Sequence, residues 1–304
     1  MSRQTRDTLR AYLFVGPWIF SLLLFTAYPM LASFYFSFTR YTVLKPAEWI
    51  GAENFQVMFT QDPLFWKAVW NTLYFTLLSV PLQMITALLL ATLLNQSTRG
   101  IGLYRTAFYL PALVPTVVTT LLWMLILDPR AGLFNAGLQA LGLPKLTWLY
   151  SATWSKPSLI LMSLWLGVGS PMLIFLAGLR DIPQSLIEAA IIDGANAWQR
   201  YWSVTIPLLS PTIFFNLIMA LIASFQVFAT AFVATSTAQG ASGIGPLDSL
   251  LMYMVHLYRQ GFKYFSMGYA SAMAVLLFAV LVLLTLLVVR SSSLWVHYEG
   301  GAPQ

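Results

Sequence analysis

The sequence predicts an all-α integral membrane protein with six transmembrane helices. Hydrophobic residues make up 59% of the 304 residues and charged residues only 9%, whereas about 25% of the residues in a typical soluble domain are charged. The charges are also segregated, because six long intervals contain no Asp, Glu, Lys or Arg. These intervals are residues 11–39, 68–98, 106–127, 157–179, 201–247 and 264–289.

Each uncharged interval predicts one transmembrane helix. A helix needs roughly 20 apolar residues to cross about 30 Å of hydrocarbon, and each interval is long enough. Strands are excluded because backbone groups in lipid find no water, and because the intervals lack the alternation of a barrel strand. We therefore predict a single transmembrane domain, residues 1–304. Its spans are predicted at about residues 11–39, 69–95, 106–127, 157–179, 209–235 and 265–289.

Prolines lie in or near several spans. Their positions are 17, 29, 81, 111, 115, 171 and 211. Membrane helices tolerate proline when neighbouring groups satisfy the freed carbonyl groups. These prolines therefore indicate kinks, and hence a bundle that moves. The alternative is that Pro17, Pro111 and Pro211 only mark helix starts.

Basic residues orient the predicted bundle. Arg3, Arg6 and Arg10 precede the first span, and such charges favour the cytoplasmic side. Six spans return the C-terminus to that side, so we predict a multi-pass protein of the cytoplasmic (inner) membrane with both termini in the cytoplasm. A cleaved signal peptide is disfavoured because the first uncharged stretch exceeds an h-region of about 7 to 15 residues.

The composition excludes several kinds of site. The chain has no Cys and only two His residues, His256 and His297, which are too few to indicate a metal centre. The glycine-rich stretch 239–246 lacks the Lys and hydroxyl group of a nucleotide-binding loop. No span carries the acidic residue, Lys or His of a proton relay. We therefore expect a partner protein to supply the energy for any movement of the bundle.

The net charge of +6 does not indicate nucleic-acid binding. The Lys and Arg residues lie in short segments beside the spans, where they contact lipid headgroups. We therefore expect membrane lipid, and no nucleic acid, as a partner.

The most informative segment is residues 180–207, between the fourth and fifth spans, and we call it the coupling segment. Asp181 is predicted to cap a helix that has Pro183 close to its first turn. This helix is predicted to end where Gly194 adopts a left-handed conformation. The predicted orientation places the coupling segment in the cytoplasm.

A second short helix is predicted to follow Gly194. It would carry Trp198, Tyr201 and Trp202 on an apolar side. Pro207 would then start the next span. The coupling segment is thus predicted to be a helix, a hinge and a helix, parallel to the membrane.

The first helix of the coupling segment is suited to docking. Ala189 and Ala190 allow close approach of a partner backbone, and Glu188 and Asp193 offer charge-assisted hydrogen bonds to basic residues. The alternative is an amphipathic helix that rests on lipid headgroups. An anionic leaflet disfavours acidic residues, so docking to a protein is favoured.

The coupling segment resembles the signature of the inner-membrane permease subunits of binding-protein-dependent ABC importers. That signature reads EAA, three residues, G, nine residues and IxLP. The residues that fit are Glu188, Ala189, Ala190, Gly194 and Pro207. Val204 and Ile206 replace the Ile and Leu of the signature conservatively.

The resemblance implies the fold of a type I ABC importer permease. In that family this segment forms a coupling helix that sits in a cleft of a cytoplasmic ATPase. The residues that would couple to the ATPase are Glu188, Ala189, Ala190, Asp193, Gly194, Ile206 and Pro207. ATP and Mg would bind to the partner ATPase, so this chain would hold no cofactor and would not be an enzyme.

A narrower likeness connects the chain to the sugar and glycerol-phosphate branch, similar to the permeases for maltose and lactose. Segments 51–55, 105–111 and 268–272 carry this likeness. It implies a permease that carries a sugar, such as an oligosaccharide, or a related polyol by alternating access. It also implies three partners: a second homologous permease, an ABC ATPase dimer and an extracytoplasmic substrate-binding protein.

A substrate path is expected at the fifth span, because in the resembled maltose permease the helix after the coupling segment contacts sugar. Gln226 and Thr230 stand four residues apart, on one face of a helix, and Phe225 and Phe228 flank them. Such groups suit a hydroxyl-rich ligand. The alternative is that Gln226 and Thr230 only form hydrogen bonds between helices.

The rival function is a self-contained secondary transporter or channel. The coupling segment and the lack of ionisable residues in the spans favour the importer permease. An integral-membrane enzyme is disfavoured because no catalytic constellation is visible.

Overall fold

The computed structural model describes residues 3–96, 99–237 and 244–297. The chain divides into two compact units, residues 1–63 with 257–280 and residues 64–256 with 281–304. That the chain forms a single transmembrane domain stays a prediction.

Long apolar helices dominate the described part of the chain. Four helical segments there are long and apolar enough to cross a membrane, and two bent helix pairs raise the number to as many as six. They are Tyr12–Phe36, Pro63–Leu94, Ala197–Thr235 and Met267–Ser292, and the pairs Ile101–Leu113 with Thr116–Ile126 and Ser155–Gly167 with Gly169–Asp181. The predicted helical membrane fold is confirmed.

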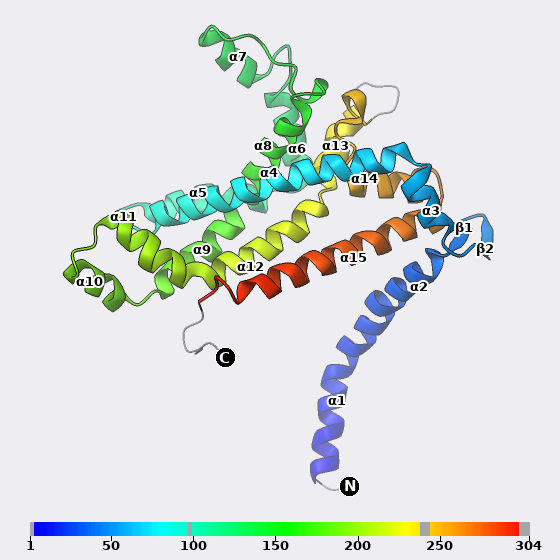
Figure 1. Ribbon diagram of the computed structural model, residues 1–304, viewed down its shortest axis with the longest axis horizontal. Coiled ribbons are helices and arrows are strands. Elements are labelled where there is room, and N and C mark those ends of the chain that lie inside the picture. Colours follow the sequence, from blue (N-terminus) through cyan, green and yellow to red (C-terminus); the bar gives the residue numbers. More distant parts are fainter. Residues whose placement is uncertain (1–2, 97–98, 238–243, 298–304) are drawn as a thin grey trace. The chain divides into compact units, whose positions relative to one another are not determined.

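The first unit contains the N-terminal helices, a β-hairpin and the start of the last helix (Figure 1). Its elements are α1 (Arg3–Leu22), α2 (Tyr28–Phe36), β1 (Thr39–Thr42), β2 (Lys45–Trp49), α3 (Glu53–Thr60), a π-helical turn (Arg259–Lys263) and α15 (Met267–Ser292), of which residues 267–280 belong here. A π-helical turn, Leu23–Ala27, joins α1 to α2, so these two helices form one continuous apolar segment.

The β-hairpin is an addition to the predicted helices. Its strands pair antiparallel through a turn at Val43 and Leu44, which lacks the Asn-Gly or Asp-Gly pair that marks a two-residue hairpin. Pro46 in β2 also argues against a strand in the sequence. The aromatic rings of Phe38 and Trp49 stack with centroids 5.7 Å apart. Contacts of this kind, and not local turn signals, identify the hairpin.

The second unit holds the remaining helices. They are α4 (Pro63–Leu94), α5 (Ile101–Leu113), α6 (Thr116–Ile126), α7 (Leu133–Ala140), α8 (Ser155–Gly167), α9 (Gly169–Asp181), α10 (Gln184–Ile192), α11 (Ala197–Arg200), α12 (Ile206–Phe225), α13 (Ala229–Thr237) and α14 (Tyr253–Tyr258). Helix α9 packs against both α5 and α12, and α13 packs against α6 and α8 (Figure 1). The coupling segment therefore joins two helices that already lie side by side.

Glycines allow this close packing of α9. A Cβ at Gly169 would lie 3.1 Å from the carbonyl oxygen of Phe108 in α5. A Cβ at Gly178 would lie 2.6 Å from the hydroxyl oxygen of Thr212 in α12. Small residues of this kind let membrane helices approach each other.

The strongest bend lies at Pro115. Helices α5 and α6 meet there at 101°. Val114 is extended, with φ −80° and ψ 135°, because a residue before proline is pushed out of the helical region. The other prolines at 17, 81, 111 and 211 lie inside helices. One predicted kink is therefore a sharp break, and these four prolines do not start their helices.

A second bend separates α8 from α9, at 49°. The carbonyl of Gly167 would accept a hydrogen bond from the residue four positions later in a regular helix, but that residue is Pro171, which has no N–H. Instead, the side-chain amide Nε2 of Gln83 in α4 donates to the oxygen of Gly167 at 2.7 Å. This bond fits the expectation that neighbouring helices satisfy the carbonyl groups that proline frees.

Gln83→Leu is expected to destabilise the second unit. The substitution removes the donor to Gly167, and an unpaired, partly buried carbonyl group costs about 1–3 kcal/mol. The apparent melting temperature of the purified protein in detergent should fall. Gln139→Leu, at an exposed position of α7, is the control and should leave that temperature nearly unchanged. Equal melting of the two variants would contradict the role of Gln83.

Candidate functional site

The coupling segment begins with a proline-defined turn between α9 and α10. Helix α9 continues through Asp181, and α10 begins at Gln184 without a capping side chain. The prediction that Asp181 caps this helix was therefore wrong. Ile182 is extended, with φ −67° and ψ 122°, because it precedes Pro183. The break thus falls after Asp181, which stays part of the preceding helix.

Helix α10 ends at a left-handed glycine, as predicted. Gly194 has φ +79°. Its N–H donates to the oxygen of Ile191 at 3.0 Å, and the N–H of Ala195 donates to the oxygen of Ala190 at 2.9 Å. These two bonds form a Schellman motif, which closes a helix and satisfies its last carbonyl groups. The chain therefore turns back at a fixed position.

The second helix starts with a capping box. The side-chain oxygen Oδ1 of Asn196 accepts from the N–H of Gln199 at 2.9 Å, and Oε1 of Gln199 accepts from the N–H of Asn196 at 2.8 Å. Nη1 of Arg200 also donates to the carbonyl of Ala195 at 2.7 Å. Each bond satisfies a group at a helix end that would otherwise lack a partner.

This second helix does not stop before the fifth span. A π-helical turn, Tyr201–Thr205, joins α11 to α12, which has Pro207 in its first turn. The N–H of Ile206 donates to the oxygen of Tyr201, five residues earlier, and this wider turn accommodates the proline. Pro207 therefore lies at the start of α12, as predicted, but the short helix before it continues into the fifth span. The orientation relative to the membrane stays a prediction.

Most of the predicted coupling residues are exposed. Glu188 and Ala189 lie on α10, and Asp193 and Gly194 follow at its end, all of them exposed. Ala190, Ile206 and Pro207 are half-buried. Among the described helices and strands, α10 makes its main contacts with α11 and the π-helical turn. The predicted coupling residues are thus held by the fold and are mostly accessible.

Apolar side chains beside these residues are also exposed. Ile192 is 86% exposed and Trp198 is 70% exposed, and the ring of Trp198 meets that of Trp202 edge to face at 5.5 Å. Ile192 is not one of the predicted coupling residues. Its signal is its place within the EAA-x-x-x-G motif. Exposed apolar side chains next to acidic ones are typical of a protein interaction surface.

The predicted substrate-path residues do not share a helical face. Helix α12 ends at Phe225 and α13 begins at Ala229, so Gln226 and Phe228 lie in a break between them. The prediction that Gln226 and Thr230 lie on one face of a single helix was therefore wrong. Phe225 and Thr230 are buried and Gln226 is exposed. The N–H of Gln226 still donates to the oxygen of Ile222 at 3.3 Å, so Gln226 is the last residue that α12 holds. That these residues form a substrate path stays a prediction.

The described part of the chain contains no cluster of metal ligands. No three His, Asp or Glu side chains lie close enough there to hold a metal ion.

A match to a known protein family identifies the family of this chain. Residues 63–296, which include the coupling segment, match the family described as binding-protein-dependent transport system inner membrane component. The chain belongs to this family. It is therefore a membrane component of a binding-protein-dependent transport system.

Known relatives cover nearly the whole length of this inner membrane component. It is 43% identical over 297 residues to the probable ABC transporter permease protein YesP of Bacillus subtilis, which covers 97% of this chain and 94% of YesP. It is 31% identical over 285 residues to the arabinooligosaccharides transport system permease protein AraP of the same organism, which covers 92% of this chain and 88% of AraP. These relatives extend the match to the N-terminal residues.

A solved structure has the same fold. It is a bacterial alginate ABC transporter in complex with an alginate pentasaccharide-bound periplasmic protein, and one of its chains is 26% identical with a TM-score of 0.80. The comparison covers 95% of each chain. The type I importer permease fold implied by the coupling motif is thereby confirmed.

Proposed function

We propose that this chain is a permease subunit of an ATP-driven ABC importer that carries a sugar, such as an oligosaccharide, across the cytoplasmic membrane. The observation that carries the proposal is the coupling segment, in which a Schellman motif and a capping box hold exposed acidic and apolar residues in a fixed turn. The similarity to AraP and to the alginate transporter supports a sugar. Transport proceeds by alternating access.

The coupling segment is the docking site for the ATPase. Glu188, Ala189 and Asp193 face a basic cleft of the ATPase, where charge-assisted hydrogen bonds form. Ile206 and Pro207 lie beyond the π-helical turn, where α12 starts. Because α11, this turn and α12 form one continuous helical segment, movement of the docked turn passes directly into the fifth span.

The importer needs three further components. A second homologous permease completes the pathway, an ABC ATPase dimer binds ATP and Mg and hydrolyses ATP, and an extracytoplasmic protein delivers the sugar. The periplasmic protein in the alginate transporter structure supports the last of these. Both termini of this chain lie in the cytoplasm, so the coupling segment does as well.

The sugar passes the break between α12 and α13. Gln226 and the carbonyl groups of the break supply hydrogen bonds, while Phe225 and Phe228 supply apolar contacts. Thr230 lies in the first turn of α13. The stacked rings of Phe228 and Phe232, with centroids 5.1 Å apart, support an aromatic wall at this place.

Copurification tests the proposed function. The chain is co-expressed with a candidate partner permease and ATPase and purified through a tag on this chain. Glu188→Lys is expected to remove most of the ATPase, because the reversed charge repels basic residues of the cleft. Asp181→Lys reverses another exposed acidic residue of the coupling segment and should retain the ATPase. Retention of the partner permease in both variants shows that the chain has folded.

Two outcomes would overturn the proposal. One is a well-folded wild-type chain that never copurifies with an ATPase. The other is equal loss of the ATPase in Glu188→Lys and Asp181→Lys. The loss would then reflect a general effect of charge and not a specific docking site.

A further inference from the structure

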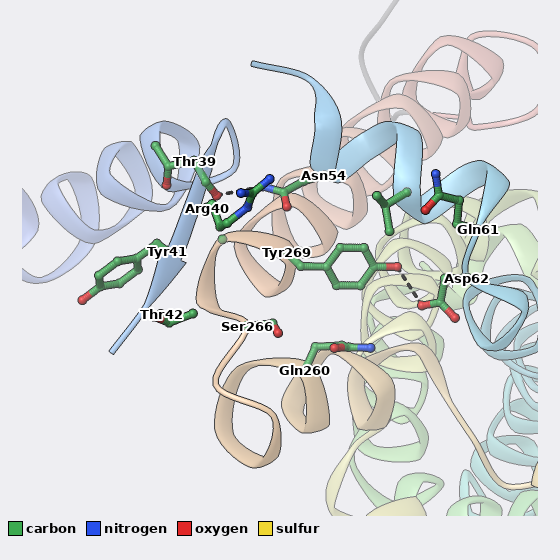
Figure 2. A pocket seen from close by; sticks show the side chains of 12 residues that line it. Thr39, Arg40, Tyr41, Thr42, Asn54, Gln61, Asp62, Gln260, Ser266 and Tyr269 are labelled. Carbon is green, nitrogen blue, oxygen red and sulfur yellow. Dashed lines mark hydrogen bonds between the residues drawn. The ribbon is translucent and has the colours of Figure 1, made fainter. Parts of the chain in front are cut away.

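The first unit contains a polar pocket of about 380 Å³. It is formed by β1, α3 and the two residues after it, residues 260 and 266, and the first turn of α15 (Figure 2). This volume falls within the range of about 300–1,000 Å³ of small-molecule sites. The polar side chains that matter here are Gln61, Asp62, Gln260, Ser266 and Tyr269. We call this cavity the polar pocket.

The wall of the polar pocket is held rigidly at β1. Asn54 is 9% exposed, and its Nδ2 donates to the carbonyl oxygens of Ser37 and Thr39, both at 2.9 Å. Gly268 lies so close to Thr39 that a Cβ there would overlap the carbonyl oxygen of Thr39. Asn54 belongs to segment 51–55 and Gly268 to segment 268–272. Both segments that carry the sugar-branch likeness in this unit therefore build the same pocket.

The opposite wall carries Tyr269 and Asp62. The hydroxyl of Tyr269 donates to Oδ2 of Asp62 at 2.7 Å. Figure 2 shows the ring of Tyr269 extended from α15 toward Asp62, with Gln260 and Ser266 nearby. This hydrogen bond fixes the tyrosine ring, so an aromatic surface and a carboxylate stand in a defined arrangement. Prior ordering of this kind lowers the entropy cost of binding a ligand.

The pocket also offers hydrogen-bonding groups that the protein does not use. The side chains of Gln61, Gln260 and Ser266 form no hydrogen bond with another residue in the described part of the chain. Each amide provides both a donor and an acceptor, and the serine hydroxyl does the same. Neighbouring donors and acceptors match the alternating hydroxyl groups of a polyol or a sugar ring.

The charges of the polar pocket favour a neutral ligand. Arg40 and Asp62 are the charged residues among those that line it. Nη2 of Arg40 is held by the carboxylate of Glu53, at 2.9 Å and 3.2 Å from its two oxygens. Its charge is therefore paired within the protein, and the carboxylate of Asp62, which accepts from Tyr269, adds a negative charge to the lining. A phosphate or a uronate would have to displace Glu53 from Arg40 and would also be repelled by Asp62.

We propose that the polar pocket binds a neutral sugar unit, separately from the predicted substrate path at the break between α12 and α13. The amides of Gln61 and Gln260 and the carboxylate of Asp62 bind its hydroxyl groups, and the ring of Tyr269 covers an apolar face of the sugar. This site rests on the proposed function, because the pocket lies in segments that the sequence orientation places outside the cytoplasm. It would receive the sugar before the sugar enters the membrane.

Cysteine labelling tests this site, because the chain contains no natural Cys. Thr42→Cys and Val57→Cys each place a single thiol at a residue that lines the polar pocket but has no proposed role in binding the sugar. Leu44→Cys, at a position that is 92% exposed in the hairpin turn, is the control. The variants are purified with the partner permease and ATPase. Labelling of this chain by a hydrophilic maleimide is then followed by mass spectrometry with and without saccharides.

Neutral saccharides should protect the two pocket thiols only. The probes are maltotriose, arabinotriose, trehalose and lactose, with trigalacturonate and glycerol 3-phosphate as anionic probes. At about ten times its dissociation constant, a neutral saccharide should slow labelling about tenfold. Neither anion should do so, and Leu44→Cys should react at the same rate throughout.

Three results would overturn the proposal. No protection by any neutral saccharide excludes a sugar site, and equal protection by the anions excludes charge selection. Pocket thiols that react in the chain alone but not in the complex show that a protein segment fills the pocket. Only preparations that retain the ATPase are used. Loss of the ATPase therefore refutes the proposed function, and failed protection in its presence refutes only this site.

Discussion

Gly194→Val is expected to reduce the ATPase activity of the assembled importer about tenfold or more, whereas Gly194→Asn should stay close to wild type. Gly194 has φ +79°, and a Cβ there would meet no atom within 4 Å. Space is therefore not the obstacle. The left-handed conformation costs an ordinary residue about 1–2 kcal/mol and a β-branched residue more, while Asn adopts it readily. About 1.4 kcal/mol corresponds to a tenfold change in population.

The measurement is the ATPase activity that the binding protein stimulates in the purified complex. Gly102→Val is the matched control, because Gly102 also has open space around it but lies within helix α5 with ordinary φ. If Gly102→Val lowers activity as much as Gly194→Val does, the loss of activity results from any Gly-to-Val substitution and not from the left-handed turn. If Gly194→Asn is as inactive as Gly194→Val, the left-handed turn is not what the ATPase requires.

The sequence predicted the features that depend on neighbouring residues. Gly194 ends α10 because glycine itself adopts the left-handed conformation that this helix end requires. The kink at Pro171 and the break at Pro115 follow from a missing N–H and from the restricted residue before proline. The apolar spans follow from composition alone. In each case the signal and its effect lie within a few residues.

The sequence did not predict the features that depend on residues far apart in the chain. Gln83 supports the bend at Gly167 across 84 positions of the chain, and the hairpin and the polar pocket depend on Asn54 and Gly268 in the same way. The break after Phe225 contains no Pro or Gly. The Ser224 hydroxyl donates to the carbonyl of Leu221 at 2.8 Å, a local bond that competes with a regular helix. Serine makes such bonds too often for sequence alone to place a break.

The coupling segment departs from its local signals at two places. Asp181 is a good capping residue, yet it ends α9 and does not cap α10. Pro207 does lie in the first turn of α12, but the chain before it stays helical. Helix α9 extends through Asp181, and the hydroxyl groups of Tyr201 and Thr92 in α4 approach to 3.5 Å, which ties the π-helical turn to the bundle. The continuous helix from α11 into α12 is the feature that best serves a coupling role.

Gly268→Ala is expected to destabilise the first unit by about 3 kcal/mol, in spite of the usual gain when alanine replaces glycine in a helix. Gly268 lies in the first turn of α15, where its new methyl group would overlap the carbonyl oxygen of Thr39 and lie 3.0 Å from the backbone nitrogen of Tyr41. Both groups belong to the backbone of β1, so no side-chain rotation relieves the contact. The strand and its hairpin must move.

The apparent melting temperature in detergent measures this effect, with Gly16→Ala as the matched control. Gly16 lies within α1 and has open space around it, so its substitution should be neutral or slightly stabilising. Gly268→Ala should melt several degrees lower than wild type. It should also speed maleimide labelling of a cysteine at position 57, because displacement of β1 opens the polar pocket. If Gly268→Ala melts like Gly16→Ala, the close contact between α15 and β1 is not part of the fold, and the rigid wall of the polar pocket is lost with it.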